Sequence, residues 1–159
     1  MIDNYGAVVA LMNIEFTNLT NIDCDAERII GVAEYALSRL GIHPDSELSI
    51  STVDEVEMSA LHERWLDESG PTDVLSFPMD ELLPDSAANG PGILGDIVLC
   101  PQFAARQAET AGHTLAEELE LLTVHGVLHL LGFDHRESEE KRIMFDKQDD
   151  YLKGWRSQR

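Results

Sequence analysis

The spacing of apolar residues along the chain predicts both strands and helices. Residues 12–16 alternate between apolar and polar side chains, which is the pattern of a half-buried strand. From Asp25 to Gly41 the apolar residues instead recur every three or four positions, so they form one stripe along a helix. We expect this helix to follow Asp25 and to end at Gly41 as a cap.

The same kind of pattern divides the rest of the chain into shorter elements. Further strands are expected at residues 47–53, 72–78 and 93–99, and further helices at residues 56–66, 101–111, 114–131 and 138–153. Pro71 stands directly before the second of these strands. Thr114 and Glu117 form a capping-box pair at the head of their helix. Residues 79–92 are acidic and rich in proline and glycine, so we expect an exposed loop there.

The resulting order, β-α-β-α-β-β-α-α-α, predicts an α+β fold in which helices pack against a small mixed β-sheet. It differs from the regular βαβ units of a dinucleotide-binding fold. A chain of 159 residues is long enough for one domain with a real core. We therefore expect a single domain over residues 1–159, with residues 1–11 as an N-terminal extension.

The composition indicates where in the cell the protein is found and whether it associates with a membrane. The apolar runs are all shorter than the roughly 20 residues that span a bilayer, and residues 1–11 lack the basic start of a secretory signal. We therefore expect a cytoplasmic protein with no membrane partner. Cys24 and Cys100 belong to neither a CxxC pair nor a metal-spaced cluster, so both are expected to be buried thiols.

The formal charge of −19 argues against broad, nonspecific attraction to nucleic acid, whose backbone is also anionic. The charge is unevenly distributed, however. Residues 1–135 hold 24 acidic and four basic side chains, whereas residues 136–159 hold six acidic and seven basic ones. An anionic substrate would thus need a metal ion and a local basic patch. Alternatively, the acidic surface only keeps the protein soluble.

The chemistry is concentrated in the segment from His125 to His135. His125 and His129 are four residues apart in an apolar helical stretch, so they share one helix face. Gly132 follows the last turn, where a left-handed glycine can end the helix and turn His135 back toward the other two. Three histidines leave a fourth position open, which is typical of a catalytic zinc site. We therefore predict one Zn²⁺ per chain, held by His125, His129 and His135, on a helix that ends at Gly132.

The same spacing occurs in metzincin proteases, whose motif is H-E-x-x-H-x-x-G-x-x-H. Gly126 stands where those proteases carry the glutamate that serves as general base. A metalloprotease is therefore the less favoured enzymatic alternative. A zinc-bound water would instead suit hydrolysis of another acyl or phosphoryl bond.

Three segments together resemble the YbeY family of bacterial endoribonucleases. They are His125-Gly-Val-Leu-His129-Leu-Leu-Gly132-Phe-Asp-His135, Pro71-Thr-Asp-Val-Leu-Ser-Phe-Pro78 and Leu94-Gly-Asp-Ile-Val-Leu99. The resemblance covers roughly residues 12 to 153. It implies a zinc-dependent endoribonuclease specific for single-stranded RNA. It also implies a role in ribosome quality control and in maturing the 3′ end of small-subunit ribosomal RNA, with the small ribosomal subunit and its proteins as partners.

The chain departs from the family at one position. Many relatives carry an arginine directly after an aromatic residue shortly before the Pro-Thr-Asp strand, whereas here Leu66 follows Trp65. Arg64 comes one residue before the aromatic and is a weak candidate for that role. Arg136, next to His135, is the other candidate for contacting phosphate during catalysis.

Other polar residues have simpler interpretations. Asp134 either orients a ligand histidine or caps the turn after Gly132, and the sequence favours neither. Thr72 and Ser76 either line the cleft beside the metal or, as we favour, serve strand packing. Glu118 is expected to be exposed. His43, His62 and His113 are expected at the surface. A noncatalytic ribosome-assembly module with structural zinc is the last alternative, and a fourth protein ligand would favour it.

Overall fold

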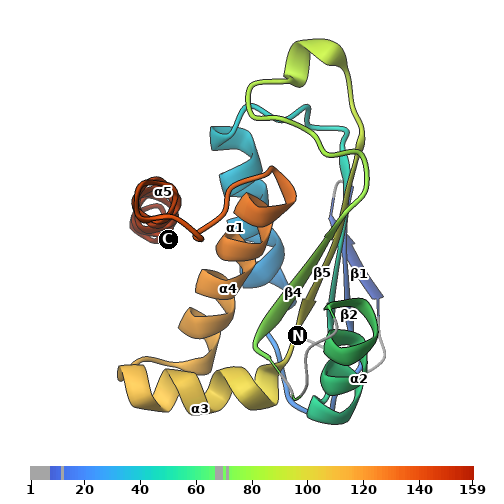
Figure 1. Ribbon diagram of the computed structural model, residues 1–159, viewed down its shortest axis with the longest axis vertical. Helices are drawn as coiled ribbons and strands as arrows, with labels where there is room; N and C mark the ends of the chain where they lie inside the picture. The colour runs from blue at the N-terminus through green and yellow to red at the C-terminus, as the bar shows by residue number, and fades with distance from the viewer. Residues whose placement is uncertain (1–7, 12, 67–69, 71) are drawn as a thin grey trace.

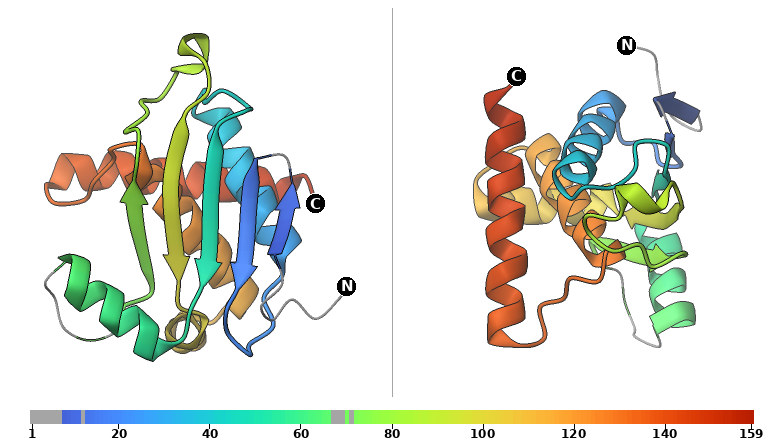
Figure 2. Two further views of the ribbon diagram at one scale, coloured as in Figure 1. Left: turned by 90° about the vertical axis from the view of Figure 1, so that its right-hand side faces the viewer. Right: turned by 90° about the horizontal axis from the view of Figure 1, so that it is seen from above.

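A five-stranded mixed sheet forms the base of the protein, as the computed structural model shows for residues 8–11, 13–66, 70 and 72–159. The strands are β1 (Val8–Leu11), β2 (Ile14–Asn18), β3 (Glu47–Thr52), β4 (Val74–Pro78) and β5 (Ile93–Leu99). Their order across the sheet is β1-β2-β3-β5-β4. The three central strands run parallel, and β1 and β4 pair antiparallel at the two edges (Figure 2, left).

Helices cover both faces of this sheet. They are α1 (Ala26–Arg39), α2 (Glu55–Leu66), α3 (Pro101–Ala111), α4 (Leu115–Leu130) and α5 (Ser138–Ser157), with a short 3₁₀ turn η1 (Ala87–Asn89) between β4 and β5. Helices α1 and α4 pack on one face, and α5 lies outside them (Figure 1). Helix α2 packs on the opposite face, where Met58 contacts Leu75 and Val98.

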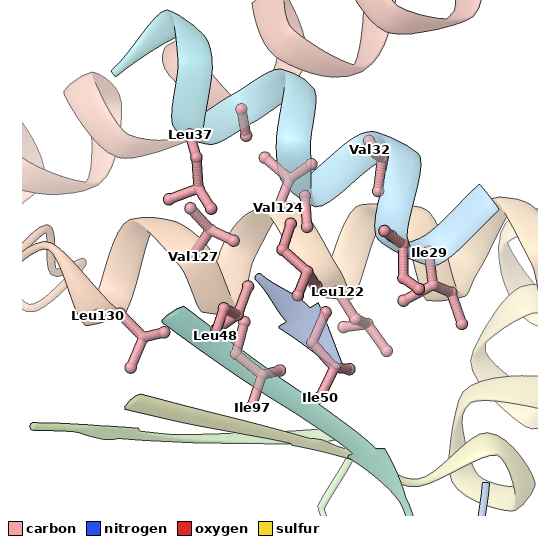
Figure 3. Packing of buried hydrophobic residues seen from close by; sticks show 14 of the residues in the cluster. Ile29, Val32, Leu37, Leu48, Ile50, Ile97, Leu122, Val124, Val127 and Leu130 are labelled. Carbon is pink, nitrogen blue, oxygen red and sulfur yellow. The ribbon is translucent and has the colours of Figure 1, made fainter. Parts of the chain in front are cut away.

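The main core lies between α1, α4 and the sheet. The stripe of α1 meets α4 and the inward side chains of β3 and β5, including Ile50 and Ile97, which are fully buried (Figure 3). Alternating side chains of β3 point to opposite faces, which gives the strand its buried–exposed pattern. This packing fixes α4 against the sheet along its length.

A buried carboxylate ties the C-terminal helix to this core. The side chain of Glu120 on α4 is fully buried, and Arg28 of α1 donates to it from 2.6 Å. Arg156 at the end of α5 donates to the same carboxylate from 3.1 Å, and Arg159 lies 3.6 Å from it. A carboxylate taken out of water needs such partners. Glu120 therefore joins α1, α4 and the end of α5.

The predicted α+β class with a small mixed sheet is confirmed. Strand β1 was not predicted, because Val8–Leu11 is a short apolar run without alternation. Residues 8–11 of the predicted N-terminal extension thus belong to the sheet, whereas residues 1–7, Met12 and Pro71 lie outside the described residues. Helix α5 continues to Ser157, four residues past the predicted end.

Candidate metal centre

Helix α4 begins and ends as its sequence predicts. At its start, Thr114 Oγ1 accepts a hydrogen bond from the Glu117 backbone, and the Glu117 carboxylate accepts one from the Thr114 backbone at 2.9 Å. His125 and His129 lie one turn apart in the second half of this helix. The capping box and the apolar packing therefore hold two histidines on a rigid element.

The third histidine reaches the other two through a glycine turn. Gly132 adopts a φ of +94°, which L side chains rarely adopt. Its N–H donates to the carbonyl of His129, and the N–H of Phe133 donates to the carbonyl of Leu128. This pair of bonds is the Schellman motif that ends a helix and reverses the chain. The reversal brings His135 back toward His125 and His129.

The three imidazole rings face one another. Ring centroids are 4.7 Å apart for His125 and His129, 5.4 Å for His125 and His135, and 5.2 Å for His129 and His135. One nitrogen from each ring lies within 4.8 Å of the other two. An ion bound about 2.0–2.1 Å from each nitrogen would hold them about 3.4 Å apart, a difference that small ring rotations close. The three residues can therefore hold a metal ion.

The two helical histidines are suited to act as neutral ligands. Burial lowers the pKa of His129 to about 4, helped by the neighbouring His125 and His135. Burial also lowers the pKa of His125, against the opposing effect of its hydrogen bond to Gln148. Metal binding requires an unprotonated imidazole nitrogen. At neutral pH both helical histidines offer one without first losing a proton.

Two side chains of helix α5 lie next to the histidine cluster. Gln148 Oε1 lies 2.9 Å from His125 Nδ1. The ring of Phe145 stands 6.1 Å from that of His125 and 6.0 Å from that of His135, centroid to centroid. Neither residue was singled out from the sequence. They lie on a separate helix, and local spacing gives no sign that α5 reaches the histidines.

The metal position has no fourth protein ligand among the described residues. The only group of three or more His, Cys, Asp or Glu side chains there that could hold a metal ion is His125, His129 and His135. Both cysteines are buried elsewhere, as predicted, and burial raises the pKa of Cys24 to about 12. The three-histidine arrangement leaves a coordination position for water or substrate.

At Gly126, helix α4 packs tightly against the sheet. A Cβ atom there would lie 3.0 to 3.2 Å from three side-chain carbons of Ile97 on β5. The Gly126 carbonyl also accepts a hydrogen bond from Ser76 Oγ on β4 at 3.3 Å. The position where a metzincin carries its glutamate is thus packed against the sheet, and a longer side chain there would have to displace Ile97.

A cleft of about 580 Å³ opens beside the centre, bounded by α3, α4, α5 and the start of β4. His125, Gln148 and Phe145 line it on the metal side, and Phe103 and Arg106 line it from α3. Clefts of this size commonly bind ligands. The Arg106 guanidinium is held at 2.6 Å by the Glu55 carboxylate, which raises the pKa of the arginine.

The two arginines predicted to contact phosphate occupy different surroundings. Arg136 follows His135 directly, and its side chain is 86% exposed beside Asp134, at 3.1 Å. Arg64 lies on α2, across the sheet from α4, with its guanidinium over the Trp65 ring. Leu66 is half exposed. Of the two predicted arginines, Arg136 is therefore the one that lies next to a histidine of the cluster.

Several other polar residues can now be located. Asp134 Oδ1 accepts a hydrogen bond from the His135 backbone, so it supports the turn. The predicted exposure of Glu118 is wrong, because the residue is 6% exposed and its carboxylate pairs with His113. His43 accepts from the Asp45 backbone, and His62 lies 3.0 Å from the Gly70 carbonyl. None of these three histidines joins the metal cluster.

Comparison with known proteins identifies the family. The model described as Endoribonuclease YbeY matches residues 14–156, which include all three histidines of the cluster. The chain belongs to the YbeY family. The Endoribonuclease YbeY of Beutenbergia cavernae is 59% identical over 139 residues, covering 86% of this chain and 93% of the relative. That of Rhodococcus opacus is 56% identical over 148 residues, covering 91% and 82%.

A solved structure is similar to this chain over most of its length. The solution structure of a Thermotoga maritima protein matches with a TM-score of 0.55 and 28% identity, covering 86% of this chain and 89% of the other.

Within the part of the chain that the structure describes, no helix is long and apolar enough to cross a membrane.

Proposed function

We propose that the protein is a zinc-dependent endoribonuclease that cuts single-stranded RNA. The observation that supports this most directly is the cluster of His125, His129 and His135, whose fourth coordination position is left open beside a cleft. Relatives named as endoribonucleases share more than half of its residues. Three imidazoles and an open position are the donor set of catalytic zinc.

Zinc bound there would supply an activated water and a positive charge near the scissile phosphate. The chain itself would do the remaining work. The three histidines hold the ion, the cleft beside His125 receives the RNA strand, and Arg136 contacts a phosphate oxygen from its exposed position. Because the chain carries a charge of −19, binding depends on these few local cations rather than on the whole surface.

The metalloprotease alternative has little structural support. A protease of that spacing uses a glutamate as general base, and the corresponding Gly126 packs within van der Waals reach of Ile97. The structural-zinc alternative calls for a fourth protein ligand, and the described residues offer three. Both observations favour hydrolysis of a phosphodiester over the other two functions.

The physiological substrate that we propose is the 3′ end of small-subunit ribosomal RNA, reached on the small ribosomal subunit in the cytoplasm. A docking protein of opposite charge would suit the acidic chain and could deliver the RNA to the cleft. In cells lacking the protein, the precursor of this RNA should accumulate. Complementation by wild type and failure by His129→Ala would support this assignment, and normal 3′ ends in the deletion strain would exclude it.

The enzymatic proposal is tested by metal analysis combined with RNA cleavage. The purified protein should contain about one zinc per chain and cut single-stranded RNA, and a chelator should stop it. His129→Ala should lose both the metal and the activity. Casein cleavage without RNA cleavage would reverse the choice of substrate. Full zinc occupancy in His125→Ala and His135→Ala would remove the ligand assignment.

A further inference from the structure

Helix α5 provides none of the three histidines, yet it contacts the metal centre at one buried polar side chain. Gln148 is 7% exposed, and its Oε1 lies 2.9 Å from Nδ1 of His125. An amide oxygen can only accept a hydrogen bond. His125 Nδ1 must therefore carry the hydrogen, which leaves the lone pair on Nε2.

We infer that Gln148 is a positioning residue, whose amide oxygen fixes the tautomer and orientation of His125 so that Nε2 is presented to the metal. The inference rests on the proposed metal site. Metal-bound histidines usually donate their second ring N–H to an oxygen acceptor, which holds the ring and increases its donor strength. Here the acceptor comes from 23 residues further along the chain.

The geometry of α5 makes this contact a fixed one. Eight residues after Gln148, Arg156 donates to the buried carboxylate of Glu120, which stands five residues before His125 on α4. Between these points, Leu152 and Trp155 of α5 pack into the main core. Helices α4 and α5 are thus joined at two polar contacts with apolar packing between them. The packing of the helix pair therefore keeps the backbone of Gln148 beside His125.

The buried position explains why the contact is specific. Because Gln148 is only 7% exposed, an amide oxygen that lost the imidazole would have little water to replace it. The Asp134 carboxylate, the other candidate for orienting a histidine, accepts from the backbone of His135 instead. Among the residues that the structure describes, Gln148 is the one whose side chain hydrogen-bonds to a ring nitrogen of the three histidines.

Two substitutions separate hydrogen bonding from packing. Gln148→Met keeps the size and burial of the side chain but removes the acceptor. Gln148→Glu keeps an acceptor oxygen in the same place. Asp149→Asn, on the exposed neighbouring residue, is the matched control. Zinc affinity is measured by competition with a chromogenic chelator, and circular dichroism verifies that each variant is folded.

We expect Gln148→Met to weaken zinc binding roughly 10- to 100-fold, the effect seen when such supporting contacts are removed. Gln148→Glu should bind zinc within about threefold of wild type or more tightly, and Asp149→Asn should match wild type. If Gln148→Met binds zinc as wild type does, or if Gln148→Glu is as weak as Gln148→Met, the positioning role is wrong.

A second measurement needs no variant. Nitrogen NMR of the metal-free wild type at pH 8 should show the hydrogen of His125 on Nδ1, and the hydrogen on Nε2 would overturn the inference. His125→Ala separates the two levels of the proposal. If it binds zinc as tightly as wild type, the metal site itself is wrong. If it loses zinc while Gln148→Met does not, only the role of Gln148 is wrong.

Discussion

Gly126 and Ile97 are in such close contact that a methyl group on Gly126 would lie 3.0 Å from Cγ2 of the isoleucine. This contact lets α4 lie directly on β5, with the two helical histidines of the candidate metal centre one and three residues away. The glycine is therefore a packing requirement of the fold as well as a departure from the protease motif.

Substituting Gly126 tests this relationship. We expect Gly126→Glu to destabilise the protein by more than about 3 kcal/mol, because it overpacks the contact and buries a charge, and to produce no peptidase activity. The measurement is urea unfolding, with casein hydrolysis in parallel. Gly126→Ala should cost less in an Ile97→Val background, which removes one contacting carbon. Equal costs in both backgrounds would show that the contact carries no energy.

Arg136 should affect RNA cleavage without affecting the metal. We expect Arg136→Ala to slow cleavage of single-stranded RNA roughly three- to tenfold at unchanged zinc content, because an exposed phosphate contact is lost. Arg142→Ala is the control, since Arg142 is also exposed and paired with carboxylates on α5. Arg64→Ala in the same assay compares the two predicted cations. A wild-type rate in Arg136→Ala would rule out the phosphate contact.

The turn at Gly132 ends helix α4 and also places His135, so a change there should affect both stability and metal affinity. Gly132→Ala forces an L side chain to a φ of +94° and should cost roughly 1–2 kcal/mol. We also expect weaker zinc binding, because His135 depends on the turn. Gly112→Ala is the matched control, since Gly112 ends α3 at a φ of +79° with open space around it. It should lower stability similarly while zinc affinity stays at the wild-type level.

The low pKa of His129 predicts how the stability of the metal-free protein depends on pH. The unfolded chain takes up a proton near pH 6.5, whereas folded His129 does so only near pH 4. The contribution of His129 to the free energy of unfolding is therefore fully present above pH 6.5 and is lost as the pH falls toward 4. Urea midpoints across this range should fall more steeply for wild type than for His129→Ala. Parallel curves would contradict the shift.

The sequence revealed the parts of the site that are close together in the chain. His125, His129, Gly132 and His135 lie within 11 residues, so helix spacing and one glycine turn were enough to predict that they meet. Gln148 and Phe145 were missed because their approach depends on how α5 packs on α4. That packing is tertiary, and it relies on the buried Glu120 and on arginines from both ends of the chain.

The errors in the fold have the same origin. Strand β1 is recognised by its pairing with β2, since four apolar residues alone do not indicate a strand. Glu118 was expected to be exposed because glutamate usually is. The turn after α3 instead brings His113 over its carboxylate, and the glutamate is buried while the histidine stays partly exposed.

The unequal exposure of the three histidines has a kinetic consequence. His125 and His129 are half buried on a rigid helix, whereas His135 is exposed on the loop beyond Gly132. An arriving ion would be captured first by the helical pair and then enclosed by the loop. Departure would run in reverse, with His135 detaching first. Exchange of the metal should therefore proceed through a state in which only His125 and His129 hold the ion and water fills its other positions, and a small chelator should speed it by attacking from the loop side.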